Sequence, residues 1–325
     1  MLVRFWGTRG SLPAPLSARG VRDKLKRALG RAAGRRFESE TAIEAFIDQE
    51  LDFTIAGTFG GNSACVEIET GSPEHLLCDM GTGMREFGSR MMAVHGPRAP
   101  QVYNVLLSHP HWDHIMGFPF FTPAYIPGNV IRIHSGHPVE EVVRRALAHQ
   151  HAAPSFPVEF KALGATIEFV QLEPGRAHTV AGCTVRTLPQ HHGGGGSYGY
   201  RVEKDGRSVV YSTDSEHKLE HAADSYPFVD FFRDADLVIF DAMYSLADAA
   251  SVKEDWGHSS NIVGVELCQL AGARHLCMFH HEPMFDDGML AEVLADTLRY
   301  EALARPAGAP PLRVSSAYDG LEIRL

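Results

Sequence analysis

Three histidines and an aspartate lie within six residues of the stretch Ser108-His109-Pro110-His111-Trp112-Asp113-His114. The apolar run 102–107 precedes this stretch, which predicts a strand that ends in a loop. On an extended segment His109 and His111 can converge on one ion, while Asp113 and His114 point from the following turn toward a second ion. Histidine-rich loops also arise by composition, since the chain has 18 histidines. This spacing nevertheless favours a site for a divalent transition metal.

Length and composition indicate a large globular protein. The 325 residues could form two average domains or one large α/β domain. Contents of 44% apolar and 22% charged residues are typical of soluble globular proteins. The formal net charge of −10 argues against nonspecific nucleic-acid binding by the whole surface, although a local basic patch could still serve.

Several features predict a cytoplasmic protein. The N-terminal run 1–7 contains Arg4 and Gly7, where a signal peptide needs a longer apolar region. No run approaches the roughly 18 apolar residues of a membrane span. The five cysteines are odd in number, scattered and mostly within apolar runs, so reduced core thiols are expected rather than disulfides or a thiolate metal site.

The segment 12–52 is expected to be a helical charged insertion. Residues 19–36 carry eight basic side chains against one acidic, with Val21, Leu25 and Leu29 at helical spacing. Residues 38–52 carry six acidic side chains and no basic one. Two solvated helices that pair with each other are one interpretation, and a phosphate-attracting rim beside the active site is the other.

Strand after strand is expected to end in a histidine or an aspartate, which is where open sheets present functional groups. The apolar runs and the residues that follow them are 76–78 with Asp79, 184–188 with the pair His191-His192, 208–212 with Asp214, 237–240 with Asp241, and 276–279 with the pair His280-His281. Asp79 fits a helix cap or turn residue, and equally a residue that orients a metal-bound histidine from behind. No repeat or linker is present, so a single domain over residues 1–325 is favoured.

In their order along the chain these motifs resemble the metallo-β-lactamase superfamily. The resemblance covers nearly the whole chain outside 12–52, and it is closest to the phosphodiesterase branch, which includes the tRNA 3′-processing endonuclease and cyclic-phosphate phosphodiesterases. It rests on Asp79, His109-x-His111-x-Asp113-His114, His192, Asp214 and His280. The fold that it implies is an α/β (α+β) four-layer αββα sandwich, with two mixed sheets face to face, helices outside and the metals at one edge.

The resemblance also implies a ligand set. One metal would be held by His109, His111 and His192, the other by Asp113, His114 and His280, with Asp214 bridging the two ions. Coordination chemistry agrees, because a carboxylate has two oxygens to share whereas an imidazole offers one lone pair. Nitrogen-rich ligation without a thiolate suits two Zn²⁺ ions, with Mn²⁺ or Fe²⁺ as weaker candidates.

Two of these ligands have a competing neighbour. His192 fits the family's apolar-Pro-x-x-His run better than His191, and His280, which directly follows an apolar strand, fits better than His281. The neighbouring histidines could instead support the ligands or face the substrate.

The metal motif alone does not identify the substrate, because such an ion pair can attack a phosphodiester, a β-lactam, a thioester or a lactone. Asp241 and His258, in Gly257-His258-Ser259-Ser260, stand where the phosphodiesterase branch pairs an acidic residue with the histidine of an H-S-T-like motif. Such a histidine could contact the phosphate or protonate the departing alkoxide. The alternative is a helix-start histidine and a strand-end cap. Aspartate replaces the glutamate of the tRNA enzyme, which weakens that particular equivalence.

The sequence therefore predicts a dinuclear metal-dependent hydrolase that acts through a metal-bridging hydroxide, with Asp113, His258 and Asp241 as catalytic residues. A small or cyclic phosphodiester is the expected substrate and an RNA end a further candidate, since no counterpart of the tRNA enzyme's long protruding arm is evident. The alternatives are a hydrolase of a lactone, thioester or β-lactam, and a non-catalytic metal-binding or sensing module. No membrane partner is expected, and a homodimer is compatible with the resemblance.

Overall fold

Two mixed β-sheets form the centre of the molecule. A computed structural model describes residues 1–217, 226–244 and 255–325. Within these residues the first seven-stranded sheet has the order β14 (Glu322–Arg324), β1 (Leu2–Gly7), β2 (Cys65–Glu69), β3 (His75–Cys78), β4 (Val102–Leu106), β5 (Val130–Ser135) and β6 (Thr166–Gln171). The second, also seven-stranded in the described part, has the order β13 (Arg313–Ser316), β12 (His275–Phe279), β11 (Leu237–Asp241), β10 (Arg207–Ser212), β9 (Ser197–Lys204), β8 (Cys183–Gln190) and β7 (Ala177–Val180).

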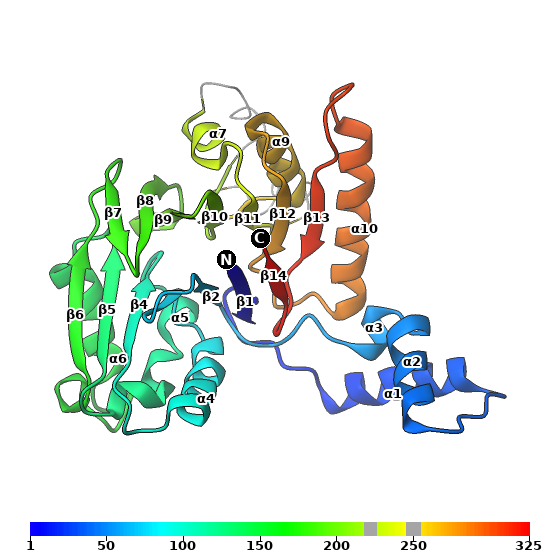
Figure 1. Cartoon of the computed structure of the whole chain (residues 1–325), viewed down its shortest axis with the longest axis horizontal. Coiled ribbons are helices and arrows are strands. Elements are labelled where there is room, and N and C mark those ends of the chain that lie inside the picture. Colours follow the sequence, from blue (N-terminus) through cyan, green and yellow to red (C-terminus); the bar gives the residue numbers. More distant parts are fainter. Residues whose placement is uncertain (218–225, 245–254) are drawn as a thin grey trace.

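Helices flank both sheets (Figure 1). The longer ones are α1 (Ala18–Ala32), α2 (Glu40–Glu50), α4 (Gly83–His95), α9 (Asn261–Ala271) and α10 (Asp287–Ala304). Shorter α-helices are α3 (Phe53–Ala56), α5 (Trp112–Ile115), α6 (Arg145–Gln150) and α7 (Pro227–Phe232). The remaining turns are the 3-10 segments η1 (Phe118–Phe120), η2 (Thr122–Tyr125), η4 (Phe160–Ala162) and η5 (Gly193–Gly195), and the π-helical segment η3 (Val139–Arg144).

The apolar runs of the sequence become strands that are buried on both faces. In β11, Leu237 and Ile239 lie in the core between the two sheets, whereas Val238 and Phe240 lie in the core beneath α7 and α9. This alternation explains why the strand is continuously apolar. A third core packs α4 against the first sheet. Three cores separate four layers, so the predicted αββα sandwich is confirmed.

The topology brings the ends of several strands to one edge of the sandwich. Strands β3 to β6 run parallel in the first sheet, and strands β10 to β13 run parallel in the second. Because the carboxyl ends of parallel strands meet at the same edge, the residues after β3, β4, β10, β11 and β12 lie close together. The predicted runs 76–78, 208–212, 237–240 and 276–279 are β3, β10, β11 and β12, whereas the run 184–188 lies in the antiparallel strand β8.

Helices α1 and α2 project beyond the sheets (Figure 1). They account for most of the segment 12–52, whose status as an insertion stays a prediction. Its two oppositely charged halves do form ion pairs, Arg31 with Asp52 and Arg35 with Glu50. The amphipathic run 261–271 forms α9, while the helical pattern of residues 139–150 is divided into the π-helical segment η3 and α6.

The five cysteines are buried and unpaired, as expected of core thiols. Within the described ranges, the helices are either too short or too polar to cross a lipid bilayer.

Candidate metal centre

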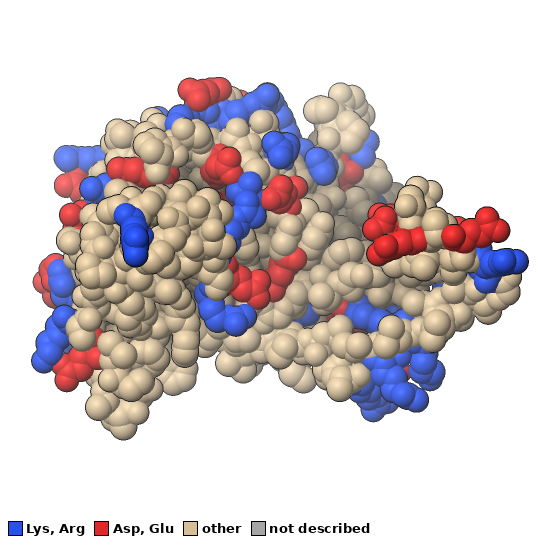
Figure 2. Space-filling model, turned by 60° about the horizontal axis from the view of Figure 1, so that its bottom comes forward, with Lys and Arg blue, Asp and Glu red and all other residues tan. Residues whose placement is uncertain are grey.

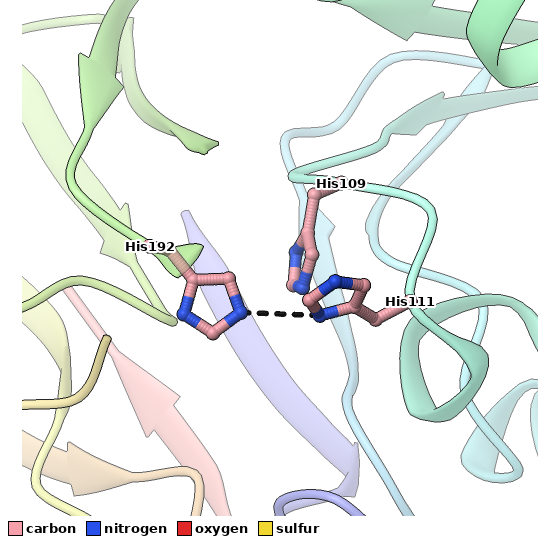
Figure 3. A group of neighbouring side chains, drawn as sticks. All are labelled: His109, His111 and His192. Atoms are coloured by element: carbon pink, nitrogen blue, oxygen red, sulfur yellow. Dashed lines mark hydrogen bonds between the residues drawn. The ribbon is translucent and has the colours of Figure 1, made fainter. Parts of the chain in front are cut away.

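A first group of three histidines faces one another across the gap between the sheets. His109 and His111 follow β4, and His192 follows β8 (Figure 3). The His192 Nε2 atom lies 3.1 Å from Nδ1 of His111. One nitrogen of each ring lies within 4.8 Å of the other two. His109 and His192 are buried whereas His111 is exposed, so this side of the centre opens to solvent at His111.

A second group joins two carboxylates to two histidines, all four of them buried. Asp113 and His114 lie in the short helix α5, Asp214 is the second residue after β10, and His280 directly follows β12. The His114 Nε2 atom lies 3.1 Å from Asp113 Oδ2 and 3.3 Å from Nε2 of His280. The four ligand atoms all fall within 4.8 Å of one another.

Asp214 contacts both groups through different oxygens. Its Oδ1 lies 3.2 Å from Nε2 of His114 and 3.1 Å from Nε2 of His280. Its Oδ2 lies 3.6 Å from Nε2 of His109 and 3.5 Å from Nε2 of His192. The structure thus brings all seven predicted ligands together, with Asp214 between the two groups.

The rings are held from behind by hydrogen bonds that orient them. Asp79 accepts from Nδ1 of His114 at 2.7 Å, and the Gly257 carbonyl accepts from Nδ1 of His192 at 2.8 Å. The Ser108 hydroxyl lies 3.0 Å from Nδ1 of His109. A hydrogen bond to Nδ1 leaves the Nε2 lone pair directed into the centre, which is the tautomer that binds a metal.

Asp79 is the hub of a buried network that the sequence revealed only in part. Its Oδ2 accepts from the hydroxyls of Ser108 and Tyr211, both at 2.7 Å, as well as from His114. Its Oδ1 accepts from the Ser108 amide at 2.7 Å. Nothing in the sequence distinguishes Tyr211 from any other core tyrosine, because it lies within the apolar strand β10.

The turn after β1 also reaches the centre. The Ser11 amide donates to Oδ2 of Asp113 at 2.9 Å. A Cβ atom on Gly10 would lie 2.5 Å from the His280 ring, closer than atoms approach without displacement, so only glycine fits there. The sequence of residues 7–11 indicates only a turn, because its partners Asp113 and His280 lie about 100 and 270 residues further along the chain.

Three residues of the centre have a left-handed backbone. Asp79, Asp214 and His280 have φ angles of 61°, 48° and 60°, and each lies one or two residues after the end of a strand. Residues other than glycine adopt this left-handed conformation only at a cost in conformational free energy.

The donor set fits a metal. Two ligand atoms that are each 2.0–2.1 Å from a tetrahedral zinc are separated by about 3.3 Å, and the separations between nitrogens and oxygens given above lie close to that value. Nε2 of His109 is buried without a hydrogen-bond partner among the described residues. An imidazole nitrogen left in this state has the lone pair that a metal requires.

The electrostatics of the cluster indicate that its buried carboxylates need a compensating positive charge. Burial opposes ionisation of Asp214, but the neighbouring His114 and His280 hold its pKa well below the usual range. Burial likewise disfavours a charged His114, yet Asp113, Asp214 and Asp79 raise its pKa well above the usual value. Burial lowers the pKa of His109, which keeps that ring neutral. A buried cluster of three carboxylates requires compensation, which either a proton on His114 or a metal cation provides.

Asp241 and His258 lie beside this centre. Nδ1 of His258 is 2.8 Å from Oδ2 of Asp241, and the His258 ring stacks on His280 with centroids 5.1 Å apart. Burial alone would lower the pKa of His258, but the charge of Asp241 raises it to about 9. The Asp241 carboxylate also accepts from the backbone of Ser215 at 3.1 Å, which holds it rigidly.

The competing histidines lie outside the two groups. His191 is exposed, and the buried His281 directs its Nε2 to the Ala317 carbonyl at 2.8 Å.

Comparisons with known proteins agree with the fold and the cluster. The family model described as the β-lactamase superfamily domain matches residues 74–281. The ribonuclease Z of Bradyrhizobium diazoefficiens is 23% identical in an alignment 296 residues long that covers 74% of this chain and 93% of that protein. The metallo-β-lactamase fold protein YhfI from Bacillus subtilis superposes with a TM-score of 0.61 at 18% identity, covering 99% of this chain and 98% of that one. The short form of human tRNase Z gives a TM-score of 0.58 at 17% identity, covering 100% and 99%.

The two facing sheets and the buried histidine and aspartate cluster define a metal-dependent hydrolase. The chain belongs to the β-lactamase superfamily, whose model matches more than half of its length. The predicted family is therefore confirmed, and the relatives named ribonuclease Z and tRNase Z lie on its predicted phosphodiesterase side. At 17% and 18% identity, the likeness to these two solved structures shows a shared fold and nothing more.

Proposed function

We propose that this protein is a dinuclear zinc phosphodiesterase whose substrate is a small or cyclic phosphodiester or an RNA end. The observation that carries the proposal is the contact between His258 and Asp241 at 2.8 Å, beside a cluster able to hold two metals. Such a pair would suit a phosphodiester, because a histidine held protonated by a carboxylate can both contact the phosphate and protonate the departing alkoxide. The names of the relatives, ribonuclease Z and tRNase Z, support the same substrate class.

Two groups of side chains would hold the ions. His109, His111 and His192 form one set, Asp113, His114 and His280 the other, and Asp214 faces both. A pair of bound zinc ions supplies a water of lowered pKa and positive charge for the phosphoryl oxygens. The protein contributes rigid placement, because hydrogen bonds from behind fix the rings of His109, His114 and His192.

His258 would assist the departure of the leaving group. Its Nδ1 is bound to Asp241, which leaves Nε2 as the nitrogen available to the substrate. The carboxylate favours the protonated ring and fixes its orientation, so His258 can contact a phosphate oxygen or donate a proton to the departing alkoxide. Asp241 acts on the substrate only through His258.

A comparison of two leaving groups tests this role. The His258→Ala variant should lose about 10²- to 10⁴-fold in turnover of a substrate that releases an alkoxide, such as short RNA or a cyclic nucleotide. The loss on bis-p-nitrophenyl phosphate should be much smaller, because p-nitrophenolate departs without a proton. An exposed histidine on α6 provides the matched control, His149→Ala, which should retain both activities.

Metal content accompanies each measurement and should equal two zinc ions per chain in all three proteins. Equal losses on the two substrates would refute proton donation by His258. Hydrolysis of a lactone or a β-lactam, with none of the phosphodiesters cleaved, would refute the proposed substrate class.

A further inference from the structure

Two exposed tryptophans adjoin residues of the proposed metal centre. Trp112 directly follows His111 and begins α5, and Trp256 directly precedes Gly257. The two tryptophans are 75% and 60% exposed. An indole offers a larger apolar face than other side chains, so it gains more than they do when a ligand covers it. The chain has three tryptophans, and two of them therefore lie where a ligand of the centre could cover them.

The third tryptophan is accommodated differently. Trp6 packs against Phe87 of α4 with ring centroids 5.8 Å apart, and its Nε1 atom donates to Glu67 at 3.1 Å. Both the apolar face and the polar atom of this indole thus have partners within the protein. Trp112 and Trp256 are instead turned to solvent, and solvent is the side from which a substrate enters.

A row of contacts connects the two exposed tryptophans across the centre. The His192 ring lies in the middle of this row, with its Nε2 atom 3.1 Å from Nδ1 of His111 and its Nδ1 atom 2.8 Å from the Gly257 carbonyl. Trp112 and Trp256 are the chain neighbours of the two ends. Because consecutive Cα atoms are only about 3.8 Å apart, the two indoles begin close to the row, on either side of the opening at His111.

The backbone that carries Trp256 is fixed by a buried carboxylate. Glu216 accepts from the amides of Asp255 and Gly257, both at 3.0 Å. Trp256 therefore lies between two anchored residues. The Glu216 amide donates to the His191 carbonyl at 2.8 Å, which ties this loop to the segment that follows β8.

The backbone that carries Trp112 is fixed as well. The Met116 amide donates to the Trp112 carbonyl at 2.7 Å, and the Ser63 hydroxyl donates to the carbonyl of the next residue, Asp113, at 2.7 Å. The Asp113 side chain in turn accepts from the Ser11 amide at 2.9 Å. Side chains on a rigid backbone lose little freedom when a ligand binds, which favours binding.

A flat aromatic group is the ligand that exposed indoles recognise best. Every nucleobase has an aromatic face, and bases stack on tryptophan with little regard to their sequence. The indoles carry no charge, so they would not compete with the metal ions or His258 for the phosphate. A ligand that joins a base to a phosphodiester would therefore use the indoles and the centre together.

The distribution of charge favours a short ligand. The described residues drawn in Figure 2 place acidic and basic side chains beside one another over the body of the molecule, and the formal net charge of the chain is −10. Nonspecific binding of a long strand depends on many contacts between phosphates and Lys or Arg. Recognition is therefore best explained by the bases next to the cleaved phosphate.

We propose that Trp112 and Trp256 form a stacking site for nucleobases attached to the phosphate that is cleaved, so that the substrate is a nucleotide diester. This inference rests on the proposed function, because it requires a centre that cleaves phosphodiesters. The two tryptophans would determine specificity and would not take part in the chemical step.

Two esters that differ by a nucleoside test the proposal. Thymidine 5′-(p-nitrophenyl) phosphate and methyl p-nitrophenyl phosphate release the same phenolate, so the ratio of their kcat/KM values measures what the nucleoside contributes. The wild type should prefer the thymidine ester. Trp112→Leu combined with Trp256→Leu should lower the ratio about 10- to 100-fold, mainly through the KM of the thymidine ester. Phenylalanine at both positions should keep most of the ratio, because its ring still offers an aromatic face.

A control variant and a binding measurement accompany the kinetics. Trp6→Phe removes the indole that packs against α4 and should keep the wild-type ratio. Calorimetry of the zinc-loaded protein compares thymidine 5′-monophosphate with deoxyribose 5-phosphate, which lacks the base. The wild type should bind the nucleotide more tightly, and the double leucine variant should lose that difference.

The outcomes separate this inference from the proposed function. Cleavage of neither ester would refute the proposed function itself. Cleavage of both esters without a preference in the wild type, or with the same ratio in the double leucine variant, would overturn the stacking site and leave the phosphodiesterase intact. An equal loss on both esters would also overturn it, since the tryptophans would then support the centre and not the base.

Discussion

Replacing Asp79 with asparagine is expected to weaken metal binding selectively at the group that contains His114. The carboxylate accepts four hydrogen bonds at 2.7 Å, from the Ser108 amide, the Ser108 hydroxyl, the Tyr211 hydroxyl and Nδ1 of His114. Asparagine has one oxygen, so its amide group must face at least one of these donors. His114 then loses the charged acceptor that holds its ring and keeps its Nε2 lone pair directed inward.

The size of the effect follows from the position of Asp79 directly behind a ligand. Removing such a partner typically lowers metal affinity by about 10- to 100-fold, or about 1.4 to 2.8 kcal/mol. Tyr211→Phe removes one of the four bonds and leaves the contact with His114 intact, so its effect on affinity should stay below about tenfold. Its free energy of unfolding should nevertheless fall by about 1.5 to 3 kcal/mol, because the lost bond was made to a charged group.

Competition with a chromogenic chelator measures the affinity for each of the two ions that we propose. In Asp79→Asn one ion should be released at lower chelator concentration, while the ion held by His109, His111 and His192 should be affected less. Circular dichroism establishes that the variant is folded. A folded Asp79→Asn protein with wild-type affinity for both ions would refute the assigned role, as would an equal weakening of both ions.

Two further predictions concern neighbouring histidines and stability in acid. His192→Ala should reduce the zinc content, whereas His191→Ala should retain it, because only the His192 ring lies in the cluster; elemental analysis of the two purified variants decides, and metal loss in His191→Ala would reverse the assignment. Burial lowers the pKa of His275 to about 4, so the ring is neutral in the folded chain and its protonation favours unfolding. Its contribution to stability is complete above pH 6.5 and is lost as the pH falls toward 4, where the loss reaches about 3 kcal/mol. His275→Gln can keep the hydrogen bond to Ser315 without this titration. Urea unfolding of the metal-free protein should therefore show a smaller difference in the free energy of unfolding between pH 6.5 and pH 4 than in the wild type. An identical difference would contradict the reasoning.

The strands that carry the centre could be predicted because they are buried on both faces. Such strands are continuous apolar runs, and a polar residue marks the point where each one leaves the core. The predicted runs before Asp79, Asp214, Asp241 and His280 are β3, β10, β11 and β12. The prediction that the ends of these strands meet in one centre came from the resemblance to a family. Spacing along the chain does not determine which strand ends meet.

Other elements escaped prediction for local reasons. The glycine-rich run 190–200 indicates either a flexible hairpin or backbone that approaches a ligand, and it does not show that β9 begins at residue 197. Gly199 lies inside that strand because the Gln190 side chain occupies the space where a Cβ atom would be, 2.6 Å away. That requirement comes from the neighbouring strand β8. For α1, helical spacing predicted the helix correctly, but its leucines are exposed, and periodicity alone does not say what they face.

The left-handed backbone of Asp79, Asp214 and His280 has opposite consequences for the stability of the protein and for its metal binding. At each of these positions glycine would relieve conformational strain, so a variant with glycine there keeps a backbone that suits the fold while it loses a ligand or its support. The relief of strain offsets part of the stability that is lost with the side chain, so a screen for folded, soluble variants would penalise such substitutions less than a screen for metal content. At these three positions of the proposed metal centre, thermodynamic stability is therefore an unreliable guide to function.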